Sequence, residues 1–105
     1  QSYFEKSFHS SPALMVITRV ADRRIVEANP AFVRACGYSR EEILGRTADE
    51  LNFWAYPAQR EEFFRLLRDQ GAVRGFESSL RLKSGAFSTF FIHADLLEIE
   101  GVLSL

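Results

Sequence analysis

The sequence predicts an α+β domain, with strands at both ends of the chain and a group of helices between them. Near both ends, apolar residues either run without interruption or alternate with polar ones, which is typical of strands. Between these segments, Pro57–Gln70 repeats its apolar residues with the period of an amphipathic helix. Because hairpin turns lie at both ends and helices in the middle, we expect one antiparallel sheet with short helices on one face.

Length, charge and composition limit the class of protein. The chain has 105 residues, the size of one domain, and 47% of them are hydrophobic, including ten phenylalanines. Its net charge is −1, without the basic cluster that contact with nucleic acid requires. The single cysteine excludes an internal disulfide, and no apolar run approaches the roughly 20 residues that span a bilayer. We expect a soluble domain that contacts neither nucleic acid nor membrane through this segment.

The N-terminal part is expected to form a short helix and two strands. Residues 3–8 are amphipathic and predict one or two helical turns. Residues 13–20 are almost continuously apolar, as expected for a strand buried on both faces. A charged turn over residues 21–24 then leads into the returning strand, Ile25–Ala28.

Two short helices follow, and the first has clear start and stop signals. Asn29 is expected to cap it, because its side-chain oxygen can accept the free N–H groups of the opening turn. Pro30 follows at the first helical position, where its missing N–H costs nothing. Gly37 is expected to end the helix in a left-handed conformation.

The second short helix has signals of its own. Ser39 and Glu42 have the spacing of a capping box, in which each side chain accepts from the main chain of the other residue. Gly45 is expected to close this helix. Residues 47–50 repeat the capping-box pattern and predict a third short turn. Helices this short are marginal on their own, so we expect apolar side chains to hold them against the sheet.

The C-terminal half is expected to form the longest helix and three strands. Pro57–Gln70 forms the helix, and Gly71 stops it. After Gly71 the apolar period changes to two, which indicates a strand. A hairpin turn over residues 83–86 leads into a long strand over residues 86–97, and a further turn leads into the last strand.

The order hairpin, Asn-Pro-x-Phe and Gly-Tyr-Ser-x-Glu-Glu-x-Leu-Gly resembles the PAS domain family, the small sensory modules of signalling proteins. The resemblance covers nearly the whole chain and extends to residues 76–85, which look like the family's penultimate hairpin. It implies a PAS-like fold with a five-stranded antiparallel sheet, in the spatial order 2-1-5-4-3. It also implies that residues 1–105 are a single cytoplasmic PAS domain, excised from a larger bacterial-type signalling protein.

The resemblance implies a sensory domain that binds a small molecule or a partner and modulates a covalently attached output domain. In this family that domain is typically the histidine kinase of a two-component system, a cyclic-dinucleotide enzyme or a helix-turn-helix transcription regulator. The alternative is a ligand-free dimerisation module that relays signals between neighbouring domains. We expect no enzymatic activity, because the adjacent pairs Glu41-Glu42 and Glu61-Glu62 point apart on their helices and no catalytic motif is present.

No haem, flavin or metal signature is present. Cys36 lies outside the Asn-Cys-Arg-Phe-Leu-Gln type of motif that the flavin-binding branch of the family uses, and a packed core thiol is the favoured interpretation. Haem-binding members typically ligate iron through a histidine on the long helix, and Pro57–Gln70 contains none. Iron ligation by His93, on the outward face of the long strand, stays open as the weaker alternative.

A pocket for a small, mostly apolar ligand is expected between the sheet and the helices, where the family has one. The inward register of Leu80 and the aromatic residues before Pro57 support it, because aromatic side chains suit the wall of such a pocket. Since phenylalanines fill much of the interior, we expect the pocket to be small. The candidate wall residues are Met15, Ile17, Phe32, Cys36, Leu51, Trp54, Phe64 and Leu80.

A homodimer is expected as well. Phe4 and Phe8 lie one helical turn apart and would form its centre. Phe87 and Phe91 lie on the outward face of the long strand, opposite the apolar face that the helices should cover. That outward face mixes apolar and polar side chains, which suits an interface.

Overall fold

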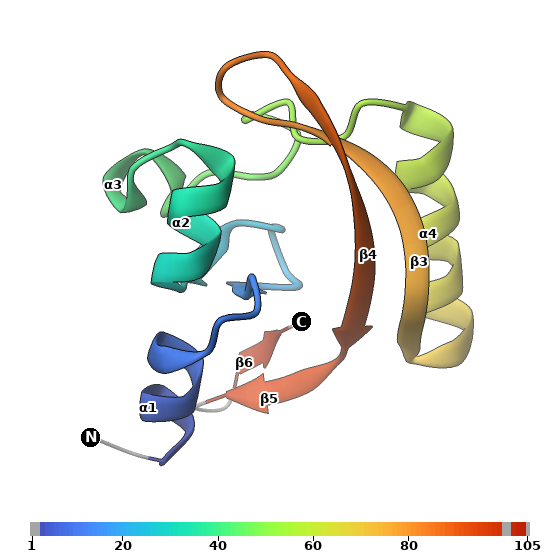
Figure 1. Cartoon of the computed structure of the whole chain (residues 1–105). Helices are drawn as coiled ribbons and strands as arrows, with labels where there is room; N and C mark the ends of the chain where they lie inside the picture. The colour runs from blue at the N-terminus through green and yellow to red at the C-terminus, as the bar shows by residue number, and fades with distance from the viewer. Residues whose placement is uncertain (1–2, 100–101, 105) are drawn as a thin grey trace.

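The computed structural model describes residues 3–99 and 102–104, and the side chains of residues 5–96. Strands lie towards both ends and most of the helices between them, as the sequence predicts (Figure 1). The helices are α1 (Tyr3–Ser10), α2 (Pro30–Cys36), α3 (Arg40–Ile43) and α4 (Pro57–Gln70). The strands are β1 (Val16–Thr18), β2 (Ile25–Ala28), β3 (Ala72–Arg81), β4 (Phe87–Asp95), β5 (Leu97–Ile99) and β6 (Val102–Ser104).

The strands form three antiparallel hairpins, β1–β2, β3–β4 and β5–β6. The expected pairs of first with second and third with fourth strand are present. The single five-stranded sheet is not formed by the described residues, because β6 pairs with β5 instead of lying between β1 and β4. Figure 1 shows β5 continuing from the end of β4 and β6 folding back against it. A hairpin between neighbours in sequence loses little chain entropy on closing, which favours this local pairing.

The first strand is shorter than predicted. Residues 13–20 were expected to form it, but only Val16–Thr18 pairs with β2. The oxygen of Met15 still accepts from the main-chain N–H of Asn29 at 2.9 Å. The rest of the segment is held by the Asn29 side chain, which binds the N–H of Met15 and the oxygen of Ala13. Leu14 and Met15 are consequently exposed and not buried on both faces.

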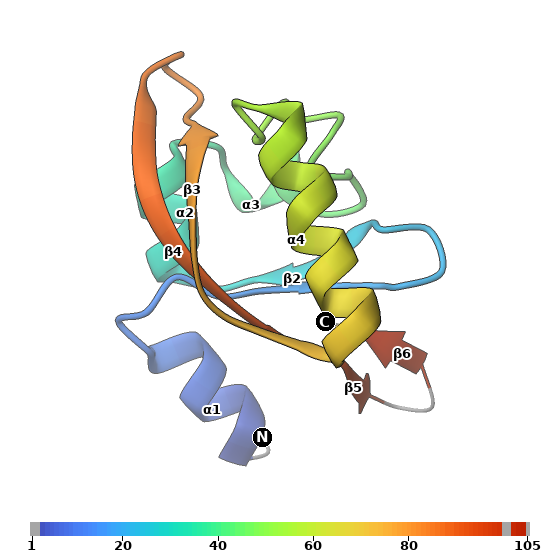
Figure 2. The same cartoon turned by 90° about the vertical axis from the view of Figure 1, so that its right-hand side faces the viewer.

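The interior consists of two apolar clusters. The N-terminal cluster gathers side chains from β2, α2, α3 and the segment before α4, namely Ile25, Ala28, Cys36, Ile43, Leu51 and Phe53. The C-terminal cluster joins α4 to β3 and β4 through Phe63, Leu67, Val73 and Ala94. Figure 2 shows α4 running beside β3. Two neighbouring residues belong to different clusters. Phe53 lies in the N-terminal cluster, and Trp54 packs against the C-terminal cluster.

A short main-chain ladder connects the two clusters. The N–H of Arg81 donates to the oxygen of Phe53 at 2.7 Å, and the N–H of Ala55 donates to the oxygen of Ser79 at 3.1 Å. The segment around Trp54 therefore extends β3 on the edge away from β4. This ladder fixes where the two clusters face each other.

The helix signals in the sequence are confirmed. Asn29 caps α2 by accepting from the N–H of Phe32, and Gly37 ends that helix with φ of 86°. Ser39 and Glu42 form both hydrogen bonds of the capping box on α3. The long helix has the predicted bounds, and the residue after it, Gly71, is left-handed.

Asn29 does more than cap a helix. Its side chain is fully buried, and its Oδ1 accepts from the N–H groups of Phe32 and Met15, both at 3.0 Å. Its Nδ2 donates to the oxygens of Ala13 at 2.8 Å and Phe8 at 3.1 Å. One amide thus joins the end of α1, the segment before β1 and the start of α2.

Asn29→Ala is expected to destabilise the domain strongly. The lost cap alone costs roughly 0.5–2 kcal/mol. The N–H of Met15, left without its partner, costs about 1–3 kcal/mol more. Urea unfolding measures the difference. Ser39→Ala, which removes an exposed cap, is the control and should cost only about 1 kcal/mol. Equal denaturant midpoints for the parent and Asn29→Ala would contradict the assignment.

Candidate ligand-binding cavity

A cavity of about 610 Å³ lies between the two clusters and extends between β1 and β4. Both clusters contribute to its wall, and its lining is mostly apolar. The apolar side chains that line it include Ile17, Phe32, Cys36, Phe53, Trp54, Phe63, Phe64, Leu80, Phe90 and Ile92. A cavity of this size and lining is suited to a small organic molecule.

All but one of the wall residues predicted from the sequence line this cavity. Those that line it are Met15, Ile17, Phe32, Cys36, Trp54, Phe64 and Leu80. Leu51 does not, because it packs inside the N-terminal cluster. The cavity is also larger than the small pocket that was expected, because it continues into the space between β1 and β4, where no described strand lies.

Sequence reasoning missed three aromatic and aliphatic wall residues on the C-terminal side. Phe63 lies on the buried stripe of α4, and Phe90 and Ile92 lie on the inward face of β4. Phe90 and Ile92 alternate with the outward-facing Phe91 and His93, so the period-two pattern of the strand places them on the opposite, covered face. That signal could have identified them as wall residues.

Three aromatic rings form one side of the cavity. The ring centroids of Trp54 and Phe63 are 5.4 Å apart, and those of Phe63 and Phe64 are 5.3 Å apart. The edge-to-face and tilted arrangements are those that aromatic rings prefer. Because Trp54 is the sole tryptophan of the chain, its fluorescence reports on this wall.

Two arginines lie at the charged edge of the cavity, near the ring of Phe64. The Cζ atom of Arg23 is 4.3 Å from the ring centroid, and that of Arg60 is 5.6 Å from it. Arg60 also binds both carboxylate oxygens of Asp49, each at 2.8 Å. Arg23, Arg60 and Asp49 all line the cavity.

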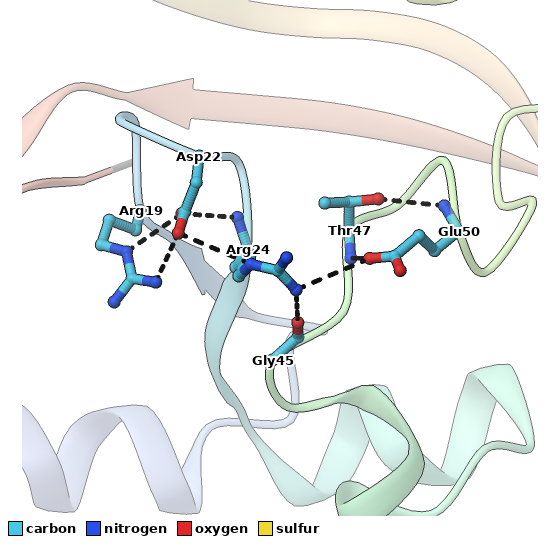
Figure 3. A network of polar contacts seen from close by, with 6 residues as sticks. All are labelled: Arg19, Asp22, Arg24, Gly45, Thr47 and Glu50. Carbon is cyan, nitrogen blue, oxygen red and sulfur yellow. Dashed lines mark hydrogen bonds and ion pairs between the residues drawn. The ribbon is translucent and has the colours of Figure 1, made fainter.

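The turn that carries Arg23 is held by its neighbours (Figure 3). Asp22 accepts from the Arg19 guanidinium at 3.0 and 2.5 Å and from the main-chain N–H of Arg24 at 3.2 Å. These interactions, with the Arg19 hydrogen bond as the main cause, lower the pKa of Asp22 to about 2. The carboxylate therefore stays ionised, and keeps the turn closed, over the physiological pH range.

The same network connects this turn to the loop after α3 (Figure 3). The Arg24 guanidinium donates to the main-chain oxygen of Gly45 at 2.5 Å and lies 3.9 Å from the Glu50 carboxylate. Glu50 also completes the predicted capping box with Thr47. The loop that begins at Gly45 leads into Asp49, so both sides of the charged edge belong to one network.

The contacts of Cys36 and His93 indicate that both side chains stabilise the fold. Burial raises the pKa of the Cys36 thiol, so it stays protonated and is a poor nucleophile. The Nδ1 atom of His93 accepts from the N–H of Gly75 at 3.3 Å and supports the irregular part of the β3–β4 pairing. Within the described residues, no group of acidic, histidine or cysteine side chains is placed to hold a metal ion. Nor is any described helix long and apolar enough to cross a membrane.

The residues expected at a dimer interface differ in their exposure to solvent. Phe87 and Phe91 are 55% and 65% exposed on the outward face of β4. Phe8 is only 8% exposed, so the expectation that it lies at the centre of a dimer interface is wrong. It is buried because the end of α1 folds onto Asn29, which binds the Phe8 main-chain oxygen. The side chain of Phe4 lies outside the described residues.

Glu42 and Lys83 join α3 to the turn between β3 and β4. The Lys83 ammonium donates to both carboxylate oxygens of Glu42, at 3.1 and 3.0 Å. The Lys83 N–H donates to the main-chain oxygen of Cys36 at 3.0 Å, beside the cavity. Hydrogen bonding from the Ser39 main chain, and then from Lys83, lowers the pKa of Glu42 below its ordinary value of 4.5.

Comparison with known proteins finds similarity over nearly the whole chain. The profile of one protein family, described as PAS fold, matches residues 2–95. Among solved structures, an RNA-binding Light-Oxygen-Voltage receptor is 21% identical with a TM-score of 0.77. That alignment covers 97% of this chain and 31% of the receptor, so the chain spans less than a third of the receptor's length. No match to a curated protein was found.

Two further solved structures cover most of both chains. The PAS domain of an HTR-like protein from Haloarcula marismortui is 25% identical with a TM-score of 0.73, over 97% of this chain and 87% of that one. A PAS domain from a two-component sensor histidine kinase is 17% identical with a TM-score of 0.77, over 99% of this chain and 93% of that one. At these identities the likeness concerns the fold.

Glu42→Gln is expected to destabilise the domain at neutral pH and to have less effect in acid. A carboxylate with a lowered pKa in the folded state adds stability above its unfolded pKa, and this stability is lost as the pH falls through the folded value. The difference in free energy of unfolding should therefore shrink as the pH falls below 4.5. Urea unfolding at several pH values measures it.

The neighbouring exposed carboxylate provides the control for this pH dependence. Glu41 accepts no hydrogen bond within the described part of the chain, so Glu41→Gln should change stability little at any pH. If the effect of Glu42→Gln is the same at neutral and acidic pH, the coupling of this carboxylate to folding is refuted.

Proposed function

The chain belongs to the PAS fold family, and from this premise we propose that it is a sensory module that binds a small, mostly apolar molecule. The observation that carries the proposal is the cavity, whose wall takes side chains from both clusters. A ligand there contacts both clusters at once. It therefore favours the arrangement of the two clusters that fits it best, and shifts the equilibrium towards that arrangement.

The proposed role is regulatory and not enzymatic. The shift in arrangement changes the activity of a covalently attached output domain, which is a histidine kinase, a cyclic-dinucleotide enzyme or a helix-turn-helix transcription regulator. The likeness to a PAS domain from a two-component sensor histidine kinase supports the first of these. We propose a cytoplasmic location in a bacterial-type signalling protein, which is what the family resemblance implies.

We further propose that a fifth strand can join the sheet between β1 and β4, which gives the expected spatial order 2-1-5-4-3. The 5 in this order is the added strand and not the element labelled β5. The outer edges of these two strands have no strand partner among the described residues. Both edges border the same cavity. A strand in this place would join the two hairpins and close the cavity on that side.

The proposed ligand is not a haem or a flavin. Cys36 lies outside the flavin-type cysteine motif, and α4 contains no histidine. Nδ1 of His93 already accepts a main-chain hydrogen bond. The purified protein is therefore expected to show no visible absorption.

A variant that fills the cavity tests ligand binding. Apolar molecules should raise the melting temperature of the parent, because a ligand at about 100 times its Kd adds about 2.7 kcal/mol to the stability. Ile92→Trp replaces an aliphatic side chain of the wall with a bulky ring that fills part of the cavity, and should abolish the shift. Glu61→Trp, on the exposed face of α4, is the control and should keep it. A screen without any shift in the parent would refute the proposal.

A second candidate function is a dimerisation module without a ligand, and the exposed Phe87 and Phe91 favour it. Large apolar side chains that lie together on a surface mark interaction sites. We propose that this face of β4 forms a homodimer, which is compatible with ligand sensing as well. Both functions then use β4, on opposite faces.

Sedimentation at tens of micromolar tests the dimer. The parent is expected to be dimeric, and Phe87→Ser combined with Phe91→Ser is expected to be monomeric with the same circular dichroism spectrum. Tyr56→Ser removes a comparably exposed aromatic side chain elsewhere and should leave the dimer intact. A monomeric parent at this concentration refutes the proposed interface.

A further inference from the structure

We propose that the ligand of this cavity is an amphiphilic monoanion, with an apolar body in the cavity and one carboxylate-type head bound by Arg23. This inference rests on the proposed function, since it names the chemical class of the molecule that the cavity takes. Three features of the charged edge carry it. They are the free guanidinium of Arg23, the conformation that holds it, and the neutralised state of Arg60.

The Arg23 guanidinium lies over the ring of Phe64, 4.3 Å from its centroid, and lines the cavity. Within the described part of the chain, no carboxylate forms an ion pair with it. A guanidinium stacked on a ring keeps the N–H groups at its edge available, and their planar arrangement matches the two oxygens of a carboxylate. Arg23 is therefore a cation with unused donors beside an apolar cavity.

The main chain holds Arg23 in a strained position. Its φ is 61°, in the left-handed region, where a glycine or an asparagine would be less strained. The N–H of Arg23 donates to the oxygen of Arg19 at 2.8 Å, and Asp22 fixes the turn on both sides. The side chain is thus placed over Phe64 before any ligand arrives. Strain of this kind is found at ligand-binding positions.

The second arginine sets the charge of the head group. Arg60 also lies near Phe64, but Asp49 binds it through two hydrogen bonds of 2.8 Å and neutralises it. Arg81 also borders the cavity, but its guanidinium donates to the main-chain oxygen of Asn52 at 2.8 Å and lies over the ring of Phe87, on the outward face of β4. Around Phe64 the edge of the cavity therefore offers one uncompensated positive charge. A head with one negative charge matches it, whereas a doubly charged head would lose hydration without a second partner.

Octanoate and octanol have equal chain lengths and differ in the charge of the head, so they separate the two parts of the proposal. Titration of the parent with each, followed through Trp54 fluorescence, gives the two affinities at the cavity wall. Octanoate is expected to bind roughly tenfold more tightly, since hydrogen bonds to charged groups are stronger than neutral ones. Octyl phosphate, mostly a dianion in mildly alkaline buffer, is expected to bind no more tightly than octanoate.

Two variants and a control assign the preference to Arg23. Arg23→Gln should bind octanoate and octanol about equally, and Arg34→Gln, which removes the same charge from the exposed face of α2, should keep the parent's preference. Asp49→Asn releases Arg60 from its partner. It should raise the affinity for octyl phosphate more than for octanol.

The outcomes separate this inference from the proposed function. If octanol binds and octanoate binds no better, or if Arg23→Gln keeps the preference for octanoate, the anion-binding role of Arg23 is overturned while the cavity remains a ligand site. Tighter binding of octyl phosphate by the parent overturns the choice of a monoanion. If neither compound binds the parent, and no apolar molecule raises its melting temperature, both proposals are overturned together.

Discussion

The buried amide of Asn29 is the interaction on which the N-terminal half of the structure depends. A primary amide taken out of water destabilises the fold unless all its donors and acceptors find partners. Asn29 meets this condition with main-chain groups from α1, the segment before β1 and the start of α2. It therefore fixes these three segments relative to each other, and with them Met15 and Phe32 on the cavity wall.

The parts of the fold that depend on local signals could be predicted from the sequence. The bounds of α4 and the cap of Asn29 follow from side chains next to the helix ends, within a few residues of the main-chain groups they serve. The length of β1 and the closure of the sheet could not be predicted in this way. A strand needs a partner that is distant in sequence. Here the Asn29 side chain binds the main chain of Ala13, which the pattern assigns to the first strand, and β5 pairs with β6, the last strand.

The cavity shows the same division between local and distant information. Its apolar wall could be largely predicted, because the register of β4 and the family resemblance both indicate which side chains point inwards. Its charged edge could not. Arg23 lies in a turn and Arg60 on a helix face, and isolated arginines in such places usually face water. Only the fold brings both to the ring of Phe64. Phe8 was misjudged for the related reason that its burial depends on contacts far along the chain.

The narrow connection between the two clusters has a consequence for the dynamics of the domain. Each cluster has its own apolar interior, and the main chain joins them chiefly through the ladder of Phe53 and Ala55 with β3. Such parts of a protein open as separate cooperative units with their own free energies. If the two clusters open in this way, the amide hydrogens of Ala55 and Arg81 are expected to exchange with solvent when the clusters separate, without unfolding of either. Slow exchange at these two amides would measure how firmly the halves are held together.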